Sequence, residues 1–109
     1  MRRGEVWRCD AHLSERGRKP GYYIIVSRPY VAETPQIATV AVVPIYSEIL
    51  GLATEVQVGP DNGLPRVSAA RGDFITSVFK SMLSRRVGQL SEEQTDSLDE
   101  ALLIALDLP

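Results

Sequence analysis

Arg71 and Asp73 are the two residues whose types and spacing point most directly to chemistry. They lie two positions apart in a predicted strand over residues 67–73, so both side chains should leave the same face of it. A carboxylate beside an arginine stays ionised and can accept a proton, while the guanidinium can bind a phosphate through two hydrogen bonds. From spacing alone, an ordinary surface ion pair stays open as the alternative.

Metal-free cleavage of RNA is one reaction that such a pair could support. The 2′-hydroxyl of RNA can attack the neighbouring phosphate, so the enzyme must position groups, move protons and stabilise negative charge. Here Arg71 would stabilise charge, because a guanidinium does not usefully lose its proton, and Asp73 would accept a proton. The group that protonates the leaving oxygen is unassigned; Ser47, Tyr46 and water are the candidates.

Few residues suit other common chemistries. The one histidine and one cysteine, His12 and Cys9, cannot form a zinc site, and no clustered carboxylates suggest Mg²⁺. The sequence also lacks the glycine patterns of nucleotide-binding loops and the nucleophile elbow of serine hydrolases. We therefore expect no metal and no cofactor, and we expect Cys9 to be a small buried strand residue.

A basic loop and the end of an apolar run supply further candidates for binding RNA. Arg18 and Lys19 lie in a glycine-containing loop, where clustered cations and backbone N–H groups can meet phosphates. Tyr46 and Ser47 could stack on and hydrogen-bond a base, and Phe74 is also placed to stack. Ordinary structural roles, such as a solvated loop or a core aromatic ring, remain open for all five residues.

Short strands separated by glycine- and proline-rich turns must position these residues. Apolar or alternating runs predict strands over residues 5–9, 22–27, 37–45, 54–58, 67–73 and 76–79. Residues 10–21 and 28–36 predict loops, and residues 80–87 are ambiguous between a short helix and a loop. This order favours a small barrel or a strongly bent sheet.

The last segment predicts an amphipathic helix. Ser91 and Gln94 have the spacing of a capping box, and Glu92 and Glu93 favour the positive end of a helix. An apolar stripe at helical spacing follows: Leu98, Ala101, Leu102, Ala105 and Leu106. The stripe should pack on the core or on a second copy of the chain, which makes the fold a β-rich α+β class.

Length and charge narrow the remaining possibilities. A chain of 109 residues predicts a single domain, 1–109, with a modest core that a dimer would reinforce. The net charge is −2, but six of the 14 acidic residues and none of the 12 basic ones lie after residue 88. The body before that point can therefore bind a polyanion. We see no membrane helix and no signal peptide, so we expect a cytoplasmic location.

Five segments in a fixed order carry a family pattern. They are RGEVW at 3–7, SERGRKP at 14–20 with IIVS at 24–27, VVPIYS at 42–47, RGDFITSV at 71–78, and VGQLS at 87–91 with LDEAL at 98–102. Together they resemble the MazF/PemK (Kid-like) family of type II toxins. The resemblance implies a homodimeric SH3-like barrel, of the kind shared with CcdB, that carries a C-terminal helix. It also implies a growth-arresting, sequence-selective and metal-independent endoribonuclease that cuts single-stranded RNA. A further implied partner is a cognate antitoxin whose disordered segment occupies the RNA groove.

The family's functional residues match this sequence in part. Arg71 and Asp73 match an Arg-x-Asp pair. The family's loop arginine corresponds to Lys19, which keeps the charge and loses the bidentate geometry. The family's catalytic threonine corresponds to Tyr46, which lacks a short aliphatic hydroxyl. The predicted catalytic residues are Arg71, Asp73 and Lys19, and the predicted substrate-binding residues are Arg18, Tyr46, Ser47 and Phe74.

Two alternatives stay open. Lys19 and Tyr46 depart from the family pattern, so the chain could be a catalytically weak or silent member that only binds RNA or an antitoxin. A gyrase inhibitor of the CcdB class has less support, because that class acts through a Trp-Gly-Ile carboxyl end and this sequence ends in Leu-Asp-Leu-Pro.

Overall fold

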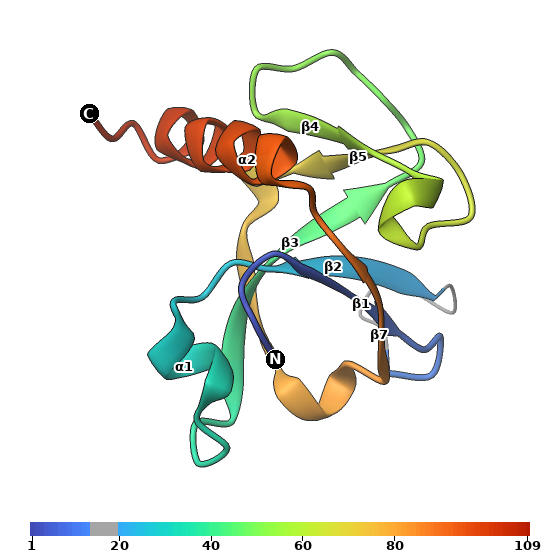
Figure 1. Ribbon diagram of the computed structural model, residues 1–109, viewed down its shortest axis with the longest axis vertical. Helices are drawn as coiled ribbons and strands as arrows, with labels where there is room; N and C mark the ends of the chain where they lie inside the picture. The colour runs from blue at the N-terminus through green and yellow to red at the C-terminus, as the bar shows by residue number, and fades with distance from the viewer. Residues whose placement is uncertain (14–19) are drawn as a thin grey trace.

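A computed structural model describes residues 1–13 and 20–109, and it shows one curled antiparallel sheet with a helix at either end (Figure 1). The strands are β1 (Glu5–Cys9), β2 (Gly21–Ile25), β3 (Thr39–Tyr46), β4 (Glu55–Val58), β5 (Ser68–Arg71), β6 (Thr76–Phe79) and β7 (Arg85–Gln89). The α-helices are α1 (Pro29–Glu33) and α2 (Glu92–Ala105), and single 3₁₀ turns are η1 (Pro60–Asn62), η2 (Gly72–Phe74) and η3 (Lys80–Met82). The strand order is β4-β5-β3-β2-β1-β7, with β6 also paired to β3.

Strand β3 organises the sheet, because it pairs with β2 on one edge and with two successive strands on the other. Its first half pairs with β6, with Val40 opposite Val78, and its end pairs with β5, with Ile45 opposite Ala70. The chain between β5 and β6 turns at η2, so the two partners diverge and the sheet curls. The continuous apolar run of β3 suits this position, which is covered on both faces.

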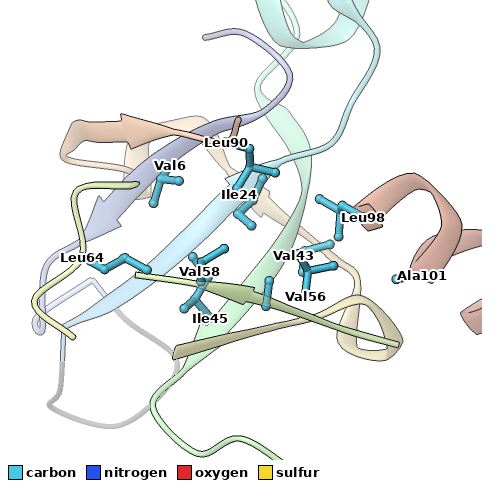
Figure 2. Packing of buried hydrophobic residues seen from close by; sticks show 11 residues of the cluster. Val6, Ile24, Val43, Ile45, Val56, Val58, Leu64, Leu90, Leu98 and Ala101 are labelled. Carbon is cyan, nitrogen blue, oxygen red and sulfur yellow. The ribbon is translucent and has the colours of Figure 1, made fainter. Parts of the chain in front are cut away.

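The curl separates two apolar cores on opposite faces of the sheet. Figure 2 shows the first, where Val6, Ile24 and Val43 from the central strands meet Leu98 and Ala101 of α2. The second core contains the side chain of Cys9, which is 1% exposed, as the sequence predicts for a small strand residue. The curled sheet and the C-terminal helix confirm the predicted β-rich barrel fold.

Helix α2 begins with the predicted capping box. The Gln94 backbone N–H donates to the Ser91 hydroxyl at 3.1 Å, and the Ser91 N–H donates to Gln94 Oε1 at 2.9 Å. Leu98 and Ala101 of the apolar stripe are buried, whereas Leu106 is exposed. The stripe therefore packs on the core through its first half only. No helix in the described ranges combines the length and apolar character needed to cross a bilayer.

Three stretches differ from the sequence-based expectation. The predicted loop at 28–36 contains α1, where Pro29 occupies the first turn, a position that needs no backbone N–H donor. The ambiguous stretch at 80–87 divides into η3 and the start of β7, which pairs with β1. The predicted strand at 67–73 ends at Arg71, and the next residues form η2. This last difference determines how the candidate site is built.

Candidate active site

A groove of about 920 Å³ opens where β3 and β5 end. Its lining includes Gly21 and Tyr22 of β2, the three residues 45–47, and the segment 64–66 that precedes β5. Arg71 and Phe74 complete one side of it. The groove therefore brings together residues from four parts of the chain, and it contains predicted site residues from two of them.

Arg71 and Asp73 form a bidentate pair, although they do not share a strand. Arg71 Nε donates to Asp73 Oδ1 at 2.9 Å, and Nη2 donates to Oδ2 at 2.6 Å. The Gly72 N–H donates to the Thr54 carbonyl at 2.8 Å, which extends the β4–β5 pairing by one residue, and the Gly72 carbonyl then accepts from the Ile75 N–H at 3.3 Å, which closes η2. A Cβ atom at Gly72 would lie 3.0 Å from the Thr54 carbonyl, so glycine permits the close approach. The predicted contact is therefore present, but a tight turn and not strand alternation creates it.

One aromatic ring covers the guanidinium of Arg71, and a second ring packs against the first. Its Cζ lies 4.1 Å from the centre of the Phe74 ring, a cation–π distance. The Tyr46 and Phe74 rings meet edge to face, with their centres 6.0 Å apart and their planes at 86°. The Arg71 side chain is 13% exposed and that of Asp73 is 29% exposed. Arg71 is thus a cation with a restricted position at the groove wall.

The charges around Arg71 keep both members of the pair ionised. The hydrogen bonds from Arg71 lower the pKa of Asp73, and they outweigh the opposing effect of burial; Thr54, whose hydroxyl donates to Asp73 at 3.2 Å, lowers it further. The same hydrogen bonds raise the pKa of Arg71, and the nearby charge of Glu55 adds to the rise. A carboxylate with a lowered pKa is a weak base, so Asp73 is better suited to holding Arg71 than to taking a proton.

The other predicted site residues divide into two sets. Tyr46 and Ser47 line the groove beside Arg71 and Phe74, so these four lie together. Arg18 and Lys19 fall outside the residues that the structure describes. Among the described residues, no three His, Cys, Asp or Glu side chains gather as a metal site would require.

Sequence reasoning missed Thr54, Glu55 and Arg66. Thr54 and Glu55 reach the pair through the β4–β5 register, in which Glu55 lies opposite Arg71. Arg66 lines the groove from the segment before β5. The turn signal at residues 59–63 could have indicated that a loop just before Arg66 forms one side of a groove. Nothing in the local sequence indicates that Thr54 and Glu55 lie beside Arg71.

Comparison with known proteins identifies the family of this chain. Residues 2–106 match the family of PemK-like, MazF-like toxins of type II toxin–antitoxin systems. The chain belongs to this family. It is 36% identical over 106 residues to a probable endoribonuclease MazF5 of Mycobacterium tuberculosis, an alignment that covers 96% of this chain and 92% of the relative. It is 30% identical over 108 residues to a probable endoribonuclease MazF of Mycolicibacterium smegmatis, with 99% and 98% of the two chains covered.

Solved structures show the same MazF fold. The toxin MazF-mt6 of Mycobacterium tuberculosis superposes with a TM-score of 0.82 at 30% identity, over 96% of this chain and 98% of that one. A mycobacterial endoribonuclease in complex with its cognate antitoxin has a TM-score of 0.82 at 27% identity, over 100% of this chain and 97% of that one. The MazF/PemK resemblance of the sequence and the predicted barrel are both confirmed.

Proposed function

We propose that this MazF-family chain is a toxin endoribonuclease that cuts single-stranded RNA and thereby arrests translation and growth. One observation carries the proposal: the groove is lined by an arginine that a carboxylate and an aromatic ring hold in a restricted position. An RNA strand needs a fixed cation for its phosphate and aromatic faces for its bases, and this groove offers both. The relatives named as endoribonucleases support the assignment.

The proposed reaction needs no metal. The 2′-hydroxyl gives its proton to a water molecule and its oxygen attacks the adjacent phosphorus, forming a 2′,3′-cyclic phosphate, while the bond to the 5′-oxygen breaks and that oxygen takes up a proton. Negative charge grows on the phosphate oxygens during this step. Asp73 engages Nε and Nη2 of Arg71, and Arg71 then presents Nη1 to a phosphate oxygen. Arg71 is accordingly the charge-stabilising residue, and Asp73 fixes its orientation.

The second proton transfer and the substrate contacts fall to residues predicted from the family pattern. Tyr46 or Ser47 is the proposed proton donor to the leaving oxygen, because both line the groove near Arg71. Lys19 is proposed to bind the scissile phosphate with Arg71, and Arg18 to bind the strand beside it. Pro20 and Gly21, which directly follow Lys19 in the sequence, line the groove, which supports these proposed roles. Phe74 and Tyr46 are proposed to stack on bases.

The proposal extends to partners and assembly. A cognate antitoxin segment would compete with RNA for the groove, in keeping with the related complex of an endoribonuclease and its antitoxin. We propose one domain spanning 1–109 that acts as a homodimer in the cytoplasm. The exposed apolar residues at the end of the chain support a further contact surface: Leu103, Ile104, Leu106 and Leu108.

The test is cleavage of a long RNA by the purified protein in EDTA, with the cut ends mapped by primer extension. We expect discrete cuts that Arg71→Ala and Asp73→Ala abolish or strongly reduce. Arg28→Ala and Asp96→Ala remove the same charges from exposed positions outside the groove and should cut normally. RNA binding without cuts would identify the silent alternative, and cuts that survive both groove changes would refute the site assignment.

A further inference from the structure

Arg66 is the cation of the groove that no carboxylate neutralises within the described part of the chain. Five other described arginines each have a carboxylate oxygen within 4.0 Å: Arg2, Arg3, Arg8, Arg71 and Arg86. Arg66 has none there, and it is exposed at the groove lining. Arg71 shares its charge with Asp73, and the exposed carboxylate of Glu48 also lines the groove without pairing to a described cation. Arg66 is therefore the groove cation that is left to meet a phosphate, even though the described wall carries no net charge.

The segment that carries Arg66 is firmly attached at its beginning. Asn62 is 3% exposed and accepts a hydrogen bond from the Gly59 N–H at 3.0 Å. Its amide nitrogen donates to the Gln89 carbonyl at 2.9 Å and to Gln94 Oε1 at 2.7 Å. A fully bonded buried amide of this kind fixes the chain strongly, because each lost bond would leave a buried polar group unpaired. Asn62 thus ties η1 to β7 and to α2.

The residues between Asn62 and β5 are fixed as well. Gly63 has φ +84°, and a Cβ atom there would lie 2.0 Å from the Val87 carbonyl oxygen, so the segment presses directly against β7. Leu64 is 5% exposed and points into the first core (Figure 2). The Ser68 hydroxyl donates to the Arg66 carbonyl at 3.0 Å. The backbone of Arg66 is therefore held on both sides while its side chain stays exposed at the groove.

Arg66 and Arg71 are separated along the groove wall. Strand β5 runs from Ser68 to Arg71 at about 3.3 Å per residue, so its ends lie about 10 Å apart, with Arg71 at one end and Arg66 two residues before the other. Arg66 is therefore placed to meet a different part of an RNA strand from the part that faces Arg71. A cation held at that distance from the reacting phosphate contributes to binding the strand and adds little charge stabilisation where the bond breaks.

We propose that Arg66 binds a backbone phosphate of the RNA other than the one that is cleaved. The proposal rests on the proposed function of the groove and extends it to a second phosphate position. Arg66 sets the affinity for the strand, and Arg71 sets the rate of the chemical step. The contact is to phosphate, so it should strengthen binding of all RNA sequences alike.

The test measures binding and cleavage separately for Arg66→Ala, Arg66→Lys and the control Arg28→Ala, which removes an exposed arginine outside the groove that pairs with no carboxylate among residues 1–13 and 20–109. Binding is followed by fluorescence anisotropy on a single-stranded RNA that carries 2′-deoxyribose at every nucleotide that could be cut. At about 0.1 M salt we expect Arg66→Ala to weaken binding about five- to tenfold, as loss of one charged phosphate contact should. The slope of log affinity against log salt should become shallower by about 0.7, the value for one phosphate of a single strand. Arg66→Lys should keep the wild-type slope, and Arg28→Ala should match wild type.

Cleavage gives the second readout. With excess enzyme, the maximal single-turnover rate of Arg66→Ala should stay within about twofold of wild type, and the enzyme concentration at half-maximal rate should rise with the binding loss. The cut positions should not change. An unchanged salt slope, a fall in the maximal rate, or altered cut positions would each overturn the proposal. A wild-type protein that binds RNA without cutting it would refute the proposed function, while the anisotropy series would still decide the role of Arg66.

Discussion

Two arginine–carboxylate pairs lie in different parts of this molecule, and they are built in opposite ways. In the groove the cation is the more enclosed partner: the Arg71 side chain is 13% exposed and that of Asp73 is 29% exposed. In the pair between β7 and β1 the carboxylate is enclosed, with Glu5 at 14% and Arg86 at 47%. The two pairs have the same chemistry but bury different members.

The donors around each carboxylate explain the difference. Glu5 accepts hydrogen bonds from the Arg2 backbone at 2.8 Å and from the Trp7 indole at 3.1 Å, and Arg86 lies 3.3 Å away. Burial raises the pKa of Glu5, but these hydrogen bonds and the charge of Arg86 together lower it below its ordinary value. This pair fastens the N-terminus and β7 to β1. The groove pair instead holds a largely enclosed cation in the lining of the groove, where we propose that it meets a substrate phosphate.

The largest expected effect is on the rate of RNA cleavage, which should depend on the groove pair and not on the β7–β1 pair. Arg71→Ala should lower the single-turnover cleavage rate by about 10²–10³-fold, the usual loss for one charge-stabilising donor. Its unfolding midpoint in urea should stay close to wild type, because the carboxylate left behind, Asp73, is 29% exposed and keeps its hydrogen bond from Thr54. A large loss of stability together with the loss of activity would show that the groove pair is also structural.

At the Glu5–Arg86 pair we expect the reverse result, a loss of stability without a loss of activity. Glu5→Ala leaves the Trp7 and Arg2 donors without their acceptor, so the free energy of unfolding should fall by about 2 kcal/mol. Urea denaturation measures this, and Glu33→Ala, which breaks an exposed pair with Arg2, serves as the control with a change near zero. The folded Glu5→Ala protein should cleave RNA at nearly the wild-type rate. A specific loss of activity at full stability would contradict the division of roles.

The stability given by Glu5 should depend on pH. The folded-state pKa of Glu5 is lowered, so its ionised form stabilises the fold above the ordinary glutamate pKa, and this stability is lost as pH falls through the folded-state pKa. The difference in unfolding free energy between wild type and Glu5→Gln should therefore be full at pH 7 and shrink steadily below the ordinary value. A difference that stays constant from pH 7 to pH 3 would rule out this origin of the effect.

The smallest effect concerns the ring that covers Arg71. Phe74→Leu keeps an apolar side chain and removes the cation–π contact, so the cleavage rate should fall about threefold. Phe79→Leu changes another exposed phenylalanine outside the groove and should leave the rate unaltered. Equal rates for wild type and Phe74→Leu would mean that Asp73 alone positions the guanidinium.

The sequence predicted the elements whose signals are local. Apolar or alternating runs located β1 to β6 but not β7, and Ser91 with Gln94 located the start of α2 within one residue. The Arg71–Asp73 contact was predicted for the wrong reason, because the strand ends at Arg71 and the turn η2, closed by the Ile75 N–H on the Gly72 carbonyl, brings Asp73 back to Arg71. Glu55 could not be placed because its position depends on strand register. The catalytic and binding roles of Lys19 and Arg18 stay predictions.

One measurement tests the central claim, that the groove pair performs the chemistry and the β7–β1 pair does not. It compares single-turnover RNA cleavage in EDTA by Arg71→Lys and Arg86→Lys, at enzyme concentrations that saturate the substrate. Lysine keeps the charge at both sites and removes the planar bidentate geometry. We predict a loss of at least tenfold for Arg71→Lys and a rate within twofold of wild type for Arg86→Lys. Equal rates for the two variants, or a larger loss for Arg86→Lys, would contradict the claim.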